Sequence, residues 1–82
     1  MWKYTAEVDG MMCGMCEAHM NDAIRLAYNV KKVSSSHGKG TTTFFTEDEV
    51  TEDSLRQVVT SLGYDMGAFK KEEAVKKGFF WK

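Results

Sequence analysis

The residues best suited to chemistry are two cysteines that stand two positions apart in the run GMMCGMC, residues 10–16. Three methionines flank them in the same run. Thiolate and thioether sulfurs are soft ligands, which select Cu(I) and a few other thiophilic ions. Cu(I) accepts two or three sulfur ligands, whereas structural Zn²⁺ prefers four. The spacing therefore points to a soft-metal site at Cys13 and Cys16.

The elements around this run predict how the two cysteines are placed. Residues 2–9 alternate between apolar and polar side chains, which is typical of a half-buried strand. From residue 16 to residue 27 the period becomes helical, with apolar positions at Met20, Ala23, Ile24 and Ala27. We expect the helix to begin at or near Cys16 and Cys13 to lie in an exposed loop. A helix N-terminus lowers the pKa of a thiol, and a metal ligand must be the thiolate, so this placement favours metal capture.

Two further strands and their turn follow the first helix. Residues 30–36 predict a second strand with apolar anchors at Val30 and Val33. Residues 41–46 are rich in threonine and phenylalanine and predict a third strand, which the turn at 37–40 joins to the second as a hairpin.

A second helix and a fourth strand complete the pattern. Thr51 is the predicted N-cap, and Val50 can pack on Leu55 as a hydrophobic staple. The apolar residues Leu55, Val58, Val59 and Leu62 repeat the helical period, and Gly63 ends the helix. Residues 64–69 read as the last strand. The order β-α-β-β-α-β predicts an α+β, ferredoxin-like sandwich: a four-stranded antiparallel sheet with both helices on one face.

The pattern weakens after residue 69. Lys70 to Lys77 could form a short helix, and the chain ends with the aromatic run Phe79-Phe80-Trp81. We therefore divide the chain into a domain over residues 1–69 and a basic, aromatic extension over residues 70–82.

Composition limits the function classes. The chain has 82 residues, which is one small domain, and residues 1–69 hold 6 basic and 10 acidic side chains. Such an acidic body argues against nucleic acid as a partner. With no long apolar run and no export signal, we expect neither membrane insertion nor secretion. The thiols should then stay reduced in the cytoplasm and serve metal binding or redox chemistry.

Gly10, Met11, Cys13 and Cys16 match the GMxCxxC signature of the heavy-metal-associated (HMA) domain family, which the chain resembles from residue 3 to about residue 69. The resemblance continues at Met20, Ala23, Ile24 and Val30, and in the run Leu62-Gly63-Tyr64. Members of the family include cytoplasmic copper chaperones and the metal-binding domains of copper-transporting P-type ATPases.

The resemblance implies a role for each matched residue. Cys13 and Cys16 would bind Cu(I), Met11 would support the loop from the core, and Tyr64 would shield the site. Cu(I) would pass to a copper-transporting P-type ATPase or another copper acceptor by exchange of thiolates, which is transfer and not enzymatic catalysis. The apo protein would be a monomer, and the metal could bridge two copies.

One departure from the family pattern bears on the metal. Met12 stands where the family commonly has threonine. A carboxylate at that position would favour Zn²⁺ or Cd²⁺, and Met12 supplies none, so Cu(I) is favoured. A second departure, Tyr28-Asn29 where many relatives have Pro-Gly, should affect only the turn after the first helix.

The other sulfur and nitrogen donors could be metal ligands or could have purely structural or solvent-facing roles, and both interpretations stay open. Met12 and Met15 are either exposed loop residues or transient thioether contacts. His19, one turn after Cys16, either faces solvent, supplies a third ligand, or donates a ligand to a second copy in a Cu-bridged dimer. His37 is interpreted as a turn residue. Cys13, Cys16, His19 and His37 could together hold Zn²⁺, but the histidine spacing fits no zinc-finger pattern.

Two other function classes compete with copper transfer. A thiol–disulfide oxidoreductase would also use a CxxC pair, but the chain has no proline, and thioredoxin-like proteins place a cis-proline beside the active site. The other class is Zn²⁺, Cd²⁺ or Hg²⁺ binding at the same two thiols.

Overall fold

A four-stranded antiparallel sheet forms the framework of the computed structural model, which describes residues 1–12 and 14–73. The strand order in the sheet is β2-β3-β1-β4. Along the chain the elements are β1 (Trp2–Asp9), α1 (Gly14–Ala27), β2 (Val30–Ser36), β3 (Thr41–Thr46), α2 (Glu52–Ser61) and β4 (Asp65–Glu73). The predicted ferredoxin-like order is confirmed.

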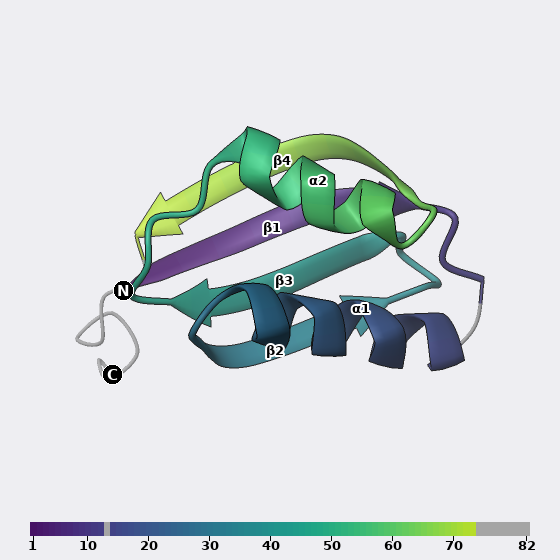
Figure 1. Cartoon of the computed structure of the whole chain (residues 1–82), viewed down its shortest axis with the longest axis horizontal. Coiled ribbons are helices and arrows are strands. Elements are labelled where there is room, and N and C mark those ends of the chain that lie inside the picture. The colour runs from purple at the N-terminus through teal and green to yellow at the C-terminus, as the bar shows by residue number, and fades with distance from the viewer. Residues whose placement is uncertain (13, 74–82) are drawn as a thin grey trace.

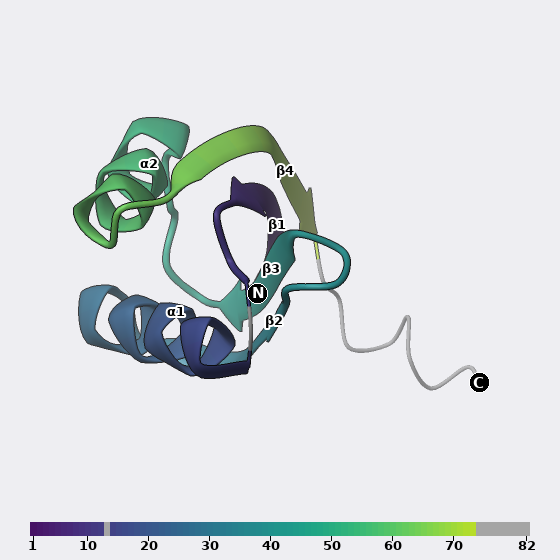
Figure 2. The same cartoon turned by 90° about the vertical axis from the view of Figure 1, so that its right-hand side faces the viewer.

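Both helices lie on the same face of the sheet, as Figure 2 shows in end view. In Figure 1, α1 runs along the β2 side and α2 along the β4 side. The core between the layers contains Tyr4 and Phe44, whose stacked rings have centroids 5.3 Å apart. Each helix covers the core with two fully buried side chains. These are Met20 and Ile24 of α1, and Leu55 and Val59 of α2.

Period-two alternation in β1 decides which side chains reach this core. Tyr4, Ala6 and Val8 are buried, whereas Glu7 and Asp9 are exposed on the other face. A strand covered on one face only needs this pattern, because successive side chains point to opposite faces. No helix in the described ranges is both long and apolar enough to cross a bilayer.

Local signals set the ends of α2 as the sequence predicts. The Thr51 hydroxyl accepts a hydrogen bond from the backbone N–H of Ser54 at 3.2 Å, which satisfies one donor of the first turn. Val50 and Leu55 are both buried, as a hydrophobic staple requires. Gly63 has φ +88°, a conformation open mainly to glycine, and ends the helix.

Three details of the predicted elements are wrong. The first helix begins at Gly14, near Cys16 as predicted, but Ala27, predicted to lie on its buried apolar face, is exposed. The last strand begins at Asp65, one residue later than predicted, and continues to Glu73.

The helix predicted from Lys70 is wrong for residues 70–73, which pair with the start of β1. The contacts of Lys71 show how the charged residues 70–73 are accommodated in the strand. Its Nζ lies 4.1 Å from the centroid of the Trp2 ring and 3.1 Å from Oε2 of Glu49, so its charge meets an aromatic face and a carboxylate. The rest of that predicted helix and the aromatic run at 79–81 lie outside the described residues.

Candidate metal centre

The candidate site lies where β1 gives way to α1. Figure 1 shows the α2–β4 connection and the β2–β3 turn at this same end of the sheet. Gly10 opens the loop with φ +115°, which L side chains rarely adopt. A Cβ at Gly10 would also lie 2.9 Å from Cδ1 of Tyr64. The Tyr64 ring therefore lies against the backbone at the start of the loop.

The three methionines of the run occupy different environments. Met11 is only 6% exposed and belongs to the hydrophobic core, whereas Met12 is 80% exposed and Met15 is 69% exposed. Burial of Met11 ties the loop to the core below it. The exposed-residue interpretation of Met12 and Met15 agrees with this arrangement.

Cys16 is the third residue of α1, half-buried, with its side chain packed against the hydrophobic core. Backbone N–H groups in a first helical turn lack carbonyl partners within the helix and favour negative charge nearby. A thiolate at Cys16 is therefore in a favourable position. Cys13, the other predicted ligand, lies outside the described residues.

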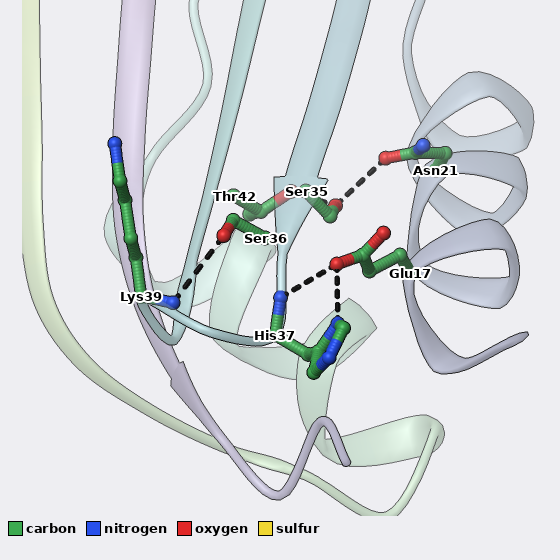
Figure 3. Close-up of polar contacts among 7 residues, drawn as sticks. All are labelled: Glu17, Asn21, Ser35, Ser36, His37, Lys39 and Thr42. Carbon is green, nitrogen blue, oxygen red and sulfur yellow. Dashed lines mark hydrogen bonds and ion pairs between the residues drawn. The ribbon is translucent and has the colours of Figure 1, made fainter. Parts of the chain in front are cut away.

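Glu17 connects the first turn of α1 to the β2–β3 turn. Its Oε2 accepts the backbone N–H of His37 at 2.7 Å and lies 2.6 Å from the Nδ1 of the same residue (Figure 3). The carboxylate can only accept, so Nδ1 donates. The backbone hydrogen bond from His37, followed by the side-chain bond, lowers the pKa of Glu17 below its ordinary value of 4.5.

Within the described part of the chain, the two histidines do not join Cys16 in a larger metal cluster. His19 is exposed on α1, and His37 lies in the β2–β3 turn, as interpreted from the sequence. Across residues 1–12 and 14–73, no three His, Cys, Asp or Glu side chains form a group that could hold a metal ion. The described residues thus contain no zinc centre built from Cys16, His19 and His37.

Sequence reasoning missed the Glu17–His37 contact. Its partners are 20 residues apart, and no local pattern links a helix residue to a turn residue at that separation. The available signal was weak: an acidic residue near the start of the predicted first helix and a histidine in the predicted hairpin turn.

No protein-family model matches the chain, but comparison with known proteins finds a relative. Over 60 residues, or 73% of its length, the chain is 32% identical to a mercuric reductase of Shigella flexneri. The chain spans only 11% of the length of that enzyme.

Solved structures resemble most of the described fold. The yeast copper transporter domain Ccc2a, solved in apo and Cu(I)-loaded states, is 26% identical with a TM-score of 0.72, over 80% of this chain and 92% of that one. A copper-binding domain of the P-type ATPase HMA7 has a TM-score of 0.75 at 22% identity, over 89% of this chain and 100% of that one.

A zinc(II) ATPase domain, that of ZiaA, also shares the fold, with a TM-score of 0.61 at 22% identity, over 78% of this chain and 92% of that one. The shared fold thus occurs in proteins named for different metals. The chain has the heavy-metal-associated fold, and its structural neighbours include the copper-binding domains of Ccc2a and HMA7.

Proposed function

We propose that the chain binds one Cu(I) ion through the thiolates of Cys13 and Cys16 and passes it to a partner protein. The observation that carries the proposal is the place of Cys16. It lies in the first turn of α1, beside a glycine-opened loop, in a fold shared with a domain solved in its Cu(I)-loaded state. Soft thiolates and Cu(I) match chemically.

The surroundings of Cys16 favour Cu(I) over Zn²⁺ or Cd²⁺. Those ions accept hard carboxylate ligands more readily. Glu17, the carboxylate nearest to Cys16 in sequence, is bound to the backbone and ring of His37. Met12, at the position before the first cysteine, is an exposed thioether. The loop therefore presents sulfur ligands to a metal, whereas the adjacent Glu17 carboxylate is already hydrogen-bonded to His37.

Transfer suits the same arrangement. The two exposed methionines and the first helical turn lie at one end of the molecule, where a partner's thiolates can approach Cu(I) and replace the first pair one at a time. Only metal–sulfur bonds change, so the chain acts as a carrier rather than an enzyme. The proposed acceptor is a copper-transporting P-type ATPase or another copper protein, in the cytoplasm. The apo chain is proposed to be a monomer, which the metal could bridge into a homodimer.

A titration under reducing, oxygen-free conditions tests the proposal. Wild-type protein should take up one Cu(I) per chain in competition with a Cu(I) chelator, with a dissociation constant below nanomolar, and Zn²⁺ in excess should not displace it. The same preparation is then assayed for insulin reduction. Weak Cu(I) binding together with insulin reductase activity would establish the oxidoreductase alternative instead.

Hg²⁺ is the second candidate cargo, because the chain is 32% identical to a mercuric reductase over 60 residues. Binding alone does not separate the two ions, since thiolate pairs hold both. The distinguishing assay adds the Hg²⁺-loaded chain to a mercuric reductase from which the matching region has been removed. Faster Hg²⁺ reduction than with free Hg²⁺ favours the mercury function, and an unchanged rate favours copper.

A further inference from the structure

The β2–β3 turn contacts both elements that flank the loop between β1 and α1. On one side, the backbone N–H of Val8, two residues before Gly10, donates to the carbonyl of Gly40 at 2.7 Å. On the other side, His37 donates from its backbone and from Nδ1 to Glu17, the residue after Cys16. One short turn thus connects the end of β1 to the start of α1.

A second contact one helical turn further along supports the same alignment. The Ser35 hydroxyl donates to Oδ1 of Asn21 at 2.7 Å and lies 2.5 Å from Oγ1 of the buried Thr42 (Figure 3). Figure 3 shows both contacts on the side of α1 that faces the hairpin. The Ser35 contact anchors the body of the helix, whereas the His37 contact reaches the first turn, where Cys16 lies.

We infer that His37 is a positioning residue for the metal site: through Glu17 it holds the first turn of α1, and with it Cys16, at a fixed distance from the end of β1. The inference rests on the proposed function. It differs from the ligand interpretations because the Nδ1 of His37 is directed at Glu17, not at a sulfur. A first turn held in place reduces the ordering that metal capture requires, so the bound ion is released more slowly.

The double hydrogen bond to a single oxygen makes this contact specific. Both donors come from one residue, so the backbone and the ring of His37 are fixed together against Glu17. Lys39 provides the contrast within the same turn. Its backbone N–H donates to Oγ of Ser36 at 3.3 Å, a contact that does not use the Lys39 side chain.

Four variants test the inference: His37→Ala, His37→Asn, Lys39→Ala and Asn21→Ala. The asparagine amide can place a donor where Nδ1 stands, so it should restore the function that alanine removes. Lys39→Ala changes the same turn without touching the contact. Asn21→Ala removes the contact to the helix body and controls for a purely structural loss.

The measurement is the rate at which each Cu(I)-loaded protein releases its ion to an excess of a Cu(I) chelator. We expect His37→Ala to release Cu(I) about 3- to 10-fold faster than wild type, the scale of one charge-assisted contact at a partly exposed site. His37→Asn, Lys39→Ala and Asn21→Ala should stay within about twofold of wild type, since each leaves the His37–Glu17 contact or a substitute for it in place.

Amide hydrogen exchange in the apo proteins gives a readout without metal. His37→Ala should speed exchange at residues 18–20, the first amides bonded within α1, whereas Lys39→Ala should not. If wild type holds Cu(I) tightly and His37→Ala releases it at the wild-type rate, the positioning role is wrong and the proposed function stands. If Asn21→Ala speeds release as much as His37→Ala, the effect is general loosening of α1 and the inference is also wrong. If wild type takes up no Cu(I), the proposed function itself has failed.

Discussion

Gly10 and Tyr64 are in direct contact, so close that a Cβ on Gly10 would lie 2.9 Å from Cδ1 of the tyrosine ring. Gly10 opens the cysteine loop, and Tyr64 follows α2, more than fifty residues later in the chain. The contact joins the two connections at this end of the sheet. Two independent features favour glycine at position 10: the nearby Tyr64 ring leaves little room for a side chain, and the backbone φ is +115°.

Replacing Gly10 by alanine should therefore destabilise the apo fold. We expect a loss of about 1–3 kcal/mol in the free energy of unfolding, from the unfavourable φ and the overlap with the ring. Urea unfolding followed by circular dichroism measures it. Gly14→Ala is the matched control, because a Cβ there meets nothing within 4 Å. Equal stabilities for the two variants would contradict the packing of Tyr64 on the loop.

Met11 and Met12 are adjacent but should respond differently to truncation. Met11 is 6% exposed and packs in the core, so Met11→Ala should cost about 2–5 kcal/mol. Met12 is 80% exposed, and Met12→Ala should change stability by less than about 0.5 kcal/mol. The same urea experiment compares them. A small effect at Met11 would show that the loop is not anchored in the core.

The lowered pKa of Glu17 predicts how its contribution to stability depends on pH. The folded state favours the ionised carboxylate, because His37 donates to it twice. The contribution is therefore present above the ordinary pKa of 4.5 and is lost as the pH falls below 4.5 through the folded-state pKa. Near neutral pH, the free energy of unfolding of wild type should therefore be larger than that of Glu17→Gln.

The difference between wild type and Glu17→Gln should shrink as the pH falls below 4.5. Paired unfolding curves from neutral to strongly acidic pH measure this dependence. Asp22→Asn is a suitable control, because the Asp22 carboxylate is exposed and forms its ion pair with Arg25 of its own helix. A difference that is constant over the whole pH range would argue against the double hydrogen bond.

His19 tests whether the site extends beyond the cysteines. It is exposed on α1, one turn after Cys16. If it is not a ligand, His19→Ala should change Cu(I) affinity by less than tenfold, which corresponds to about 1.4 kcal/mol. A chelator competition titration measures this. A larger loss of affinity would make His19 a third ligand.

The elements were predictable because each has a strong local signal. The alternation of β1, the cap at Thr51 and the glycine at Gly63 each act within a few residues, and the structure reproduces all three. The extension of β4 was not predictable in the same way. Lys71 is held by Trp2 and Glu49, which come from distant parts of the chain.

In the candidate site, too, some features were predictable from the sequence, whereas a contact between distant residues was not. Burial of Met11 and the place of Tyr64 followed from the family resemblance, and Cys16 lies in the first helical turn as its position in the sequence suggested. The contact of Glu17 with His37 depends on the tertiary approach of α1 to the hairpin. Sequence separation alone carries no information on that approach.

The central claim is that Cys13 and Cys16 together hold one Cu(I) ion. Cu(I) competition titrations of Cys13→Ser and Cys16→Ser, compared with wild type, test it most directly, with circular dichroism to confirm that each variant folds. We predict that both variants remain folded and lose tight binding, while wild type binds one ion per chain. A folded Cys13→Ser or Cys16→Ser protein that still binds Cu(I) as tightly as wild type would contradict the account.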